Sequence, residues 1–153
     1  RMLGEYVEKF YRPAARQWHR FSRDDYAPAK ELATWKSNVR GHWSRVRVRR
    51  LDSQQARISF GDALRFELAV ELDGLEPADI KVELVLGRPS DDDRPHDAKQ
   101  FELLWMKRLE GGEHLYAIEL QPELCGKIDY RFRVYPNHAL LTHPFEMGMM
   151  LWL

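Results

Sequence analysis

Three arginines at alternating positions are the residues whose spacing most clearly permits chemistry. Arg45, Arg47 and Arg49 would share one face of an extended strand, because successive side chains in a strand point to opposite faces. Such a row could bind phosphate, nucleic acid or an acidic partner. The simpler interpretation is a solvated strand face, or ion pairing with acidic residues of the same chain. Sites for nucleic acid usually add exposed aromatic rings, and only Trp43 lies near the row, so we do not expect nucleic-acid binding.

Other chemically suggestive groups do not assemble into a recognisable centre. Asp91, Asp92 and Asp93 lie near His96 and Asp97, but the segment lacks the glycine and the spaced oxygen ligands of a calcium loop. A single histidine is also too few for a zinc site. The serines have no nucleophile-elbow context, and the abundant carboxylates fall on alternating strand positions. We therefore expect no catalytic, cofactor-binding or metal-binding residue in this chain.

Two amphipathic helices are predicted before residue 44, the first from Arg1 to about Ser22 and the second from about Ala29 to Trp43. Pro13 should end or kink the first helix, because proline lacks a backbone donor and clashes with the preceding turn. Apolar side chains recur every three or four residues along one face of each helix. These are Tyr6, Val7, Phe10, Tyr11, Trp18 and Phe21 in the first, and Leu32, Trp35, Val39 and Trp43 in the second.

From Ser44 the hydrophobic period changes to two, which is typical of strands. Eight candidate strands follow, at residues 45–49, 56–60, 64–72, 80–86, 101–109, 114–120, 128–134 and 145–152. Gly111 and Gly112 should form a hairpin turn, and Trp105, on the side of Phe101 and Leu103, should lie in the core. Because turns rather than helices separate the strands, we predict an antiparallel immunoglobulin-like β-sandwich preceded by two amphipathic helices, a mainly β fold of the α+β type.

Charge divides the chain near the point where the period changes. Residues 1–50 contain 13 Lys and Arg against 5 Asp and Glu, whereas residues 51–153 contain 11 against 19. We therefore predict a helical segment at residues 1–44 and a β domain at residues 45–153. The single cysteine, Cys125, excludes an internal disulfide and fits a reducing compartment, so we expect a cytoplasmic location. No apolar run is long enough to span a bilayer, and we expect no membrane partner.

The first eleven residues, RMLGEYVEKFY, resemble the helix near the end of the catalytic region of α-glucan (glycogen and maltodextrin) phosphorylases. The matching positions are Arg1, Met2, Leu3, Glu5, Tyr6, Val7, Phe10 and Tyr11. The continuation Arg12-Pro13-Ala14-Ala15 is similar to the bacterial branch, which carries an extra C-terminal domain. The phrases at residues 82–85 and 144–148 also resemble that terminal domain. The chain is therefore expected to be a piece of such an enzyme, from its C-terminal part.

This resemblance implies a parent glycosyltransferase that splits α-1,4-glucan with inorganic phosphate to give glucose 1-phosphate, using pyridoxal phosphate bound to a lysine. The family's lysine motif and phosphate-binding loops lie upstream of the matched helix, so no catalytic or cofactor residue is carried over. The implied function is a non-catalytic domain for interdomain packing or oligomerisation. Tyr6, Val7, Phe10 and Tyr11 should pack on the parent's catalytic domain. In the separate chain, we expect this helix to fold onto its own sandwich or to pair with a second copy.

Two alternatives remain open at this point. The domain could be a glucan-binding module, and Tyr135 with Arg131 and Arg133 is then the best candidate contact, because these residues fall on the strand face opposite the core residues Tyr130 and Phe132. It could also be an unrelated sandwich whose basic arm binds nucleic acid. The expected partners are the catalytic domain of the parent chain, an α-glucan and a further copy of the chain.

Overall fold

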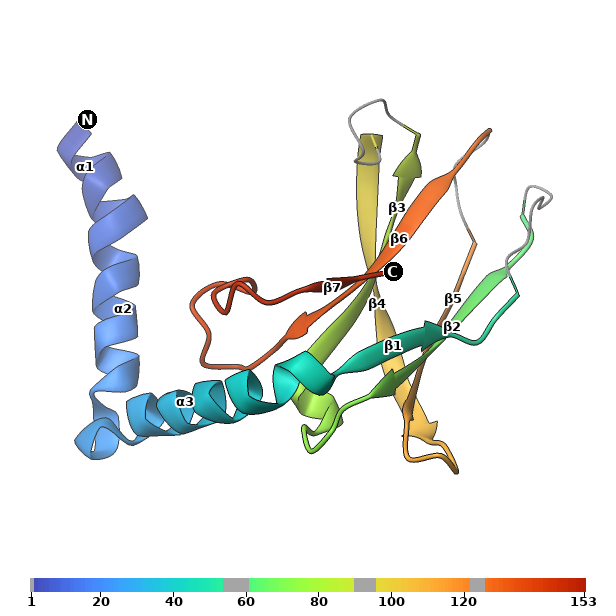
Figure 1. The fold of residues 1–153 in the computed structure, drawn as a ribbon. Coiled ribbons are helices and arrows are strands. Elements are labelled where there is room, and N and C mark those ends of the chain that lie inside the picture. Colours follow the sequence, from blue (N-terminus) through green and yellow to red (C-terminus); the bar gives the residue numbers. More distant parts are fainter. Residues whose placement is uncertain (1, 54–60, 90–95, 122–125) are drawn as a thin grey trace.

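The computed structural model describes residues 2–53, 61–89, 96–121 and 126–153. Helices occupy the N-terminal part and an antiparallel sheet occupies the rest (Figure 1), which confirms the predicted mainly β fold with N-terminal helices. The candidate strand at residues 56–60, the acidic residues Asp91 to Asp93 and Cys125 lie outside the described residues.

The N-terminal helical arm, residues 2–21, is one nearly continuous rod. It comprises α1 (Met2–Tyr6), the π-helical turn η1 (Val7–Tyr11) and α2 (Arg12–Phe21). The backbone N–H of Arg12 bonds to the carbonyl of Val7, five residues back, immediately before Pro13. A proline inside an α-helix removes one hydrogen bond and clashes with the carbonyl four residues earlier. The predicted kink or break at Pro13 therefore takes the form of a widened turn.

A sharp turn separates the arm from α3 (Arg23–His42). Asp24, Asp25 and Tyr26 have φ values of 49°, 53° and 60°, in the left-handed region. Asp tolerates this region better than most residues, whereas Tyr does not. The Tyr26 ring packs edge-on against Trp18, with centroids 6.3 Å apart, which offsets part of that cost. The chain turns steeply here, so the arm and α3 form the two limbs of an L (Figure 1).

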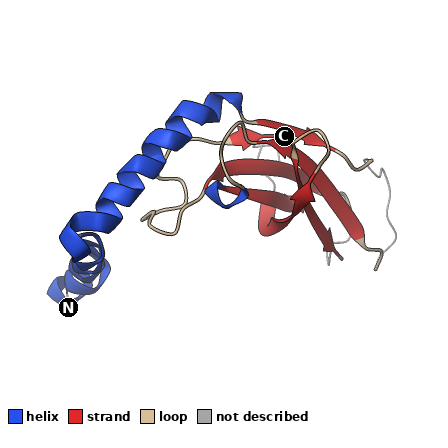
Figure 2. Cartoon of the chain, turned by 90° about the horizontal axis from the view of Figure 1, so that it is seen from below, coloured by secondary structure: helices blue, strands red, loops and turns tan. Residues whose placement is uncertain are grey.

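Seven described strands form one antiparallel sheet in the order β1-β2-β5-β4-β3-β6-β7. The strands are β1 (Arg47–Arg50), β2 (Leu64–Glu71), β3 (Ile80–Arg88), β4 (His96–Arg108), β5 (His114–Leu120), β6 (Asp129–Pro136) and β7 (Leu151–Trp152), with the short helices η2 (Trp43–Arg45) and η3 (Pro77–Asp79). The long strand β4 pairs with β3 along one part and with β5 along another. It therefore joins two half-sheets that curve around a common core (Figure 2).

The core lies between the inner faces of the two half-sheets and is closed on one side by α3. Inward positions alternate along the strands, as the period of two predicts. Its most buried side chains include Leu68, Val70, Val82, Leu84, Leu86, Leu103 and Val134 from the sheet, with Val39 of α3 and Val46. Only residues 151–152 of the candidate strand at 145–152 form a strand, and residues 144–147 form a turn instead.

Candidate functional site

Four exposed side chains, Tyr6, Val7, Phe10 and Tyr11, form what is here called the apolar strip of the helical arm. Phe10 and Tyr11 keep 61% and 67% of their surface exposed, and the rings of Tyr6 and Phe10 lie 5.5 Å apart. The strip does not pack on the sheet, from which this end of the arm projects away (Figure 1), so the first of the two expectations fails for these residues, while pairing with a second copy stays a prediction. Soluble monomers rarely leave such a cluster uncovered, so the strip has the character of a docking surface.

The second half of the arm is anchored to the C-terminal loop, residues 137–150. Gln17 Nε2 donates a hydrogen bond of 2.8 Å to Thr142 Oγ1. The guanidinium of Arg20 donates to the carbonyl of Ala139. The arm is therefore held at its α2 end, while the apolar strip projects beyond the last of these contacts.

The same loop fixes α3 to the sheet. Trp35 Nε1 donates to Asp79 Oδ1 at 2.7 Å, and the Trp35 ring lies 4.8 Å from that of His138. Lys36 forms an ion pair with Glu146, and this partner lowers the pKa of the Glu146 carboxyl below its ordinary value. The C-terminal loop therefore contacts both helical limbs, and α3 is held in addition by Asp79 of η3 and by its buried Val39.

The predicted glucan contact at Tyr135 lies in a buried polar cluster. The Tyr135 ring is only 3% exposed, and its hydroxyl donates to Glu83 Oε1 at 2.7 Å. Burial, and then the hydrogen bond to Glu83, raises the pKa of Tyr135. Arg133 is also buried, and its Nε donates to Glu83 Oε2 at 2.8 Å. The expected outward position of Tyr135 is wrong, since this ring has no free face on which a sugar could stack.

The C-terminal segment covers this cluster, which is why Tyr135 is buried although its strand face was predicted to be outward. Arg131, Arg133 and Tyr135 do share one face of β6, as the register with β3 shows. However, Phe145 packs edge-on against Tyr135 at 5.0 Å, and the guanidinium of Arg133 lies 5.0 Å from the Phe145 ring. It also lies 6.0 Å from the ring of Trp152. Alternation marks this face as outward, but Phe145 and Trp152, in the segment that follows β6, cover it.

The arginine row is largely engaged within the chain. Arg45 forms an ion pair with Asp73, and both Nε and a terminal nitrogen of Arg49 donate to Glu113. This second pairing lowers the pKa of Glu113. Arg47 donates to the carbonyl of Ser44 at 2.7 Å. The predicted pairing with the acidic half is confirmed for Arg45 and Arg49, and these partners neutralise much of the row's capacity to bind an anion.

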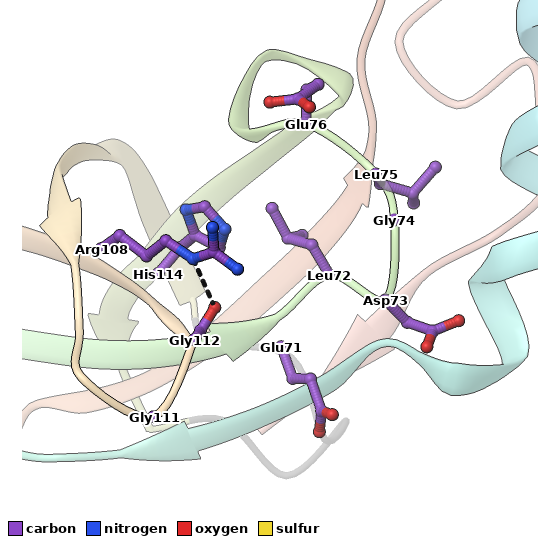
Figure 3. A pocket seen from close by; sticks show the side chains of 10 residues that line it. All are labelled: Glu71, Leu72, Asp73, Gly74, Leu75, Glu76, Arg108, Gly111, Gly112 and His114. Carbon is purple, nitrogen blue, oxygen red and sulfur yellow. Dashed lines mark hydrogen bonds between the residues drawn. The ribbon is translucent and has the colours of Figure 1, made fainter.

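A hollow of about 340 Å³ opens where the turn after β2 meets the hairpin between β4 and β5 (Figure 3). Glu71, Leu72, Asp73, Gly74, Leu75, Glu76, Arg108, Gly111, Gly112 and His114 line it. Arg108 and His114 occupy paired positions on β4 and β5, and their side chains lie next to each other (Figure 3). Gly112 adopts φ of +87° in the predicted hairpin turn, which is confirmed.

Trp105 bonds to His114, which lines this hollow, and the prediction that Trp105 belongs to the core is wrong. Its indole is 48% exposed, and its Nε1 donates to His114 Nδ1 at 3.1 Å. The register places Trp105 opposite the buried Tyr116, so the period of two assigned its side correctly. A bulge follows between Trp105 and Lys107, close to the end of β4. The sequence predicts which face of a strand a residue occupies, but not how far along the strand that face is covered by other elements.

Comparison with known proteins decides the family. Residues 43–153 match the family model described as the glycogen phosphorylase C-terminal domain. The chain belongs to this family. The predicted resemblance to the C-terminal part of an α-glucan phosphorylase is therefore confirmed.

Curated relatives of this glycogen phosphorylase C-terminal domain match the chain almost from end to end. A maltodextrin phosphorylase from Thermococcus litoralis is 32% identical over 99% of the chain. Glycogen phosphorylases from Mycobacterium bovis and Mycobacterium tuberculosis are each 30% identical over 98% of it. The chain spans only 18% of the length of each of these relatives. The helical arm lies before the family model's first matched residue, yet within the stretch that the relatives share.

Two further observations bear on what this glycogen phosphorylase C-terminal domain can bind. Within the four described stretches, no group of three His, Cys, Asp or Glu side chains is arranged to hold a metal ion. None of the helices in the described part of the chain is long and apolar enough to cross a membrane. The domain's candidate sites are thus the apolar strip of the arm and the hollow beside His114.

Proposed function

We propose that the chain is a non-catalytic C-terminal domain of an α-glucan phosphorylase and that it packs on the parent's catalytic domain through the apolar strip. The parent reaction would be phosphorolysis of α-1,4-glucan to glucose 1-phosphate. The exposed cluster of Tyr6, Val7, Phe10 and Tyr11 is the observation that carries this proposal. The short share of the relatives' length that the chain covers supports it, because a much larger partner surface would belong to the same polypeptide.

The anchoring of the arm supports a docking role. Side chains on α2 bond to the C-terminal loop, and that loop also holds α3 through Lys36 and Trp35. A docking surface gains affinity when its conformation is fixed before binding, since less entropy is lost. The domain would therefore present the strip to the catalytic domain in a defined orientation.

Pyridoxal phosphate would be held elsewhere in the parent. In such enzymes the cofactor forms a Schiff base with a lysine. Among the described lysines, Lys30, Lys36 and Lys81 form ion pairs with carboxylates, and the hollow beside His114 has no lysine in its lining. Because the chain spans only 18% of the length of its relatives, we assign the cofactor, and the reaction, to the remaining length of the parent. The cytoplasmic location remains a prediction from the sequence.

Oligomer assembly is the second use to which the strip could be put. Two copies related by a twofold axis would bury the same aromatic residues against each other. We favour the catalytic domain as the partner because it is covalently linked, which gives it a high effective concentration beside the strip.

The test uses the parent enzyme with Phe10→Ala and Tyr11→Ala introduced together. Alanine keeps the helix propensity high, so the change removes apolar surface without unwinding the arm. If both rings are buried in the parent, the interface should lose on the order of 3 kcal/mol or more. Phosphorolysis activity remaining after a heat challenge should fall well below that of the wild-type parent.

The matched control replaces Glu8 and Arg12 by alanine. These residues form an exposed ion pair on the same arm, so their loss should change stability by less than about 1 kcal/mol. Equal heat resistance of the Phe10/Tyr11 variant and this control would contradict docking through the strip. A change in the parent's sedimentation coefficient in the first variant alone would instead identify a second copy as the partner.

A further inference from the structure

The hollow between the turn after β2 and the β4–β5 hairpin is lined in part by two buried leucines, and one of its lining residues, His114, bonds to the exposed ring of Trp105. Leu72 and Leu75 line it and are themselves buried in the core, at 3% and 4% exposure. Its volume of about 340 Å³ falls within the range of small-molecule sites. The indole of Trp105 is tethered at one edge by its bond to His114, which fixes the ring plane while leaving much of its surface open. A tethered, exposed indole is a preformed stacking platform.

Polar groups around the hollow suit hydroxyl groups rather than an anion. Arg108 is a donor, and Glu76, whose charge acts on His114, is an acceptor, whereas the side chain of Glu71 points away from both Arg108 and His114 (Figure 3). Because Nδ1 of His114 accepts from Trp105, the neutral ring carries its proton on Nε2 and can donate there. Burial, and then the charge of Arg108, lowers the pKa of His114, so the ring is uncharged near neutral pH. The carboxylates outnumber the single arginine, which disfavours a phosphorylated ligand.

We infer that this hollow, with Trp105 bonded to its lining residue His114, binds a segment of neutral α-glucan chain. The sugar ring would stack on the Trp105 indole, and its hydroxyls would bond to Arg108, Glu76 and His114. The choice of α-glucan rests on the proposed function, while the preference for a neutral polyhydroxylated ligand rests on the residues themselves. Binding here would make the domain a holder of glucan in addition to a docking element.

The test titrates the full chain with maltoheptaose in a calorimeter, beside glucose and inorganic phosphate. We expect saturable binding of maltoheptaose, weaker binding of glucose and none of phosphate. Trp105→Ala should weaken maltoheptaose binding by about threefold to tenfold, the range expected for one lost stacking contact. Trp105→Phe should lose less, because it keeps a flat ring. Trp152→Ala is the matched control, since Trp152 is 55% exposed but does not contact His114, and it should bind as the wild type does.

Several results would overturn the inference. These are no heat with maltoheptaose, equal binding by the wild type and Trp105→Ala, an equal loss in Trp152→Ala, or preferential binding of phosphate. Circular dichroism of each variant establishes that it is folded, and Arg108→Met supplies a second variant that leaves the indole in place and should also weaken binding. Failure of this test leaves the docking proposal standing, because docking is tested separately through Phe10 and Tyr11 in the parent.

Discussion

Glu83 and Arg133 form a buried ion pair between β3 and β6. Both side chains are about a tenth exposed, and the hydroxyl of Tyr135 donates a further hydrogen bond to the Glu83 carboxylate. Charges in such a place are tolerated because each has a partner and further hydrogen bonds. The pair also holds the guanidinium against Phe145 and Trp152, so it ties the C-terminal segment to β6.

Removing one partner of this pair should destabilise the domain strongly. In Arg133→Met the Glu83 carboxylate stays buried and keeps as its cationic partner only the more distant ammonium of Lys81, at 3.6 Å, so the loss should be on the order of 3 kcal/mol. Urea unfolding of the chain would measure the difference in the free energy of unfolding. The double variant with Glu83→Leu should recover much of the loss, because no unpaired charge remains. A single variant within about 1 kcal/mol of the wild type would mean that water reaches the carboxylate.

His114 should make stability depend on pH. Its pKa is lowered by burial and by Arg108, with Glu76 acting in the opposite direction. The unfolded chain therefore takes up a proton at a higher pH than the folded chain does. The free energy of unfolding should fall as the pH drops below about 6.5, the ordinary value for histidine.

Denaturant unfolding at several pH values between about 5 and 8 checks this dependence. His114→Gln keeps an acceptor for the Trp105 indole but has no group that titrates in that window. Its stability should vary less with pH than that of the wild type. The same slope in both proteins would show that other groups carry the dependence.

The sequence allowed us to predict which face of a strand most residues occupy, but not whether another segment covers that face. Alternation placed Tyr135 with Arg131 and Arg133, and it placed Trp105 on the inner side of β4. Tyr135 is nevertheless buried, because Phe145 packs over it, and Trp105 is exposed, near the end of β4. Cover depends on contacts between distant segments, which no local period encodes.

At the scale of elements, α3 is the part of the helical region that belongs to the core. Val39 is fully buried within the main hydrophobic cluster, and Leu32 is nearly so. The arm has no comparable buried residue among those described. The two limbs of the L should therefore differ sharply in what they contribute to the stability of the separate chain.

Two valine substitutions test this difference between the limbs. Val39→Ala should lower the free energy of unfolding on the order of 2 kcal/mol, through lost burial and the cavity that is left. Val7→Ala makes the same chemical change in the exposed strip and should cost no more than about 0.5 kcal/mol in the separate chain. Comparable losses in chemical denaturation would indicate that the arm packs on the sheet after all.

The helices and most strands could be predicted because their hydrophobic periods are long and regular. The position of the kink at Pro13 was also predictable, but its form as a π turn was not, because several local geometries can accommodate one missing donor. The left-handed backbone conformation of Asp24 to Tyr26 could not be predicted either, because several local geometries can form a turn between two helices. The division at residues 44 and 45 remains a prediction, although α3 ends at His42 and the family model begins at residue 43.

For the whole molecule, the family and the exposed strip both favour a domain that packs on a larger partner. The chain is homologous to the C-terminal region of glycogen and maltodextrin phosphorylases, and it spans about a fifth of their length. A domain that exposes aromatic residues on a projecting arm is expected to be stable alone through α3 and the sheet. The α2 end of the arm is held by the C-terminal loop in the separate chain, whereas its apolar strip would be buried and protected from local opening only against a partner.

Hydrogen exchange of residues 2–21 is the measurement that tests this account most directly. Amide exchange would be compared between the parent enzyme and the separate chain, at a concentration where sedimentation shows the chain to be monomeric. We predict slow exchange at Tyr6, Phe10 and Tyr11 in the parent and fast exchange in the separate chain, while α3 is protected in both. Equally fast exchange of the arm in both proteins would contradict docking of the strip on the catalytic domain.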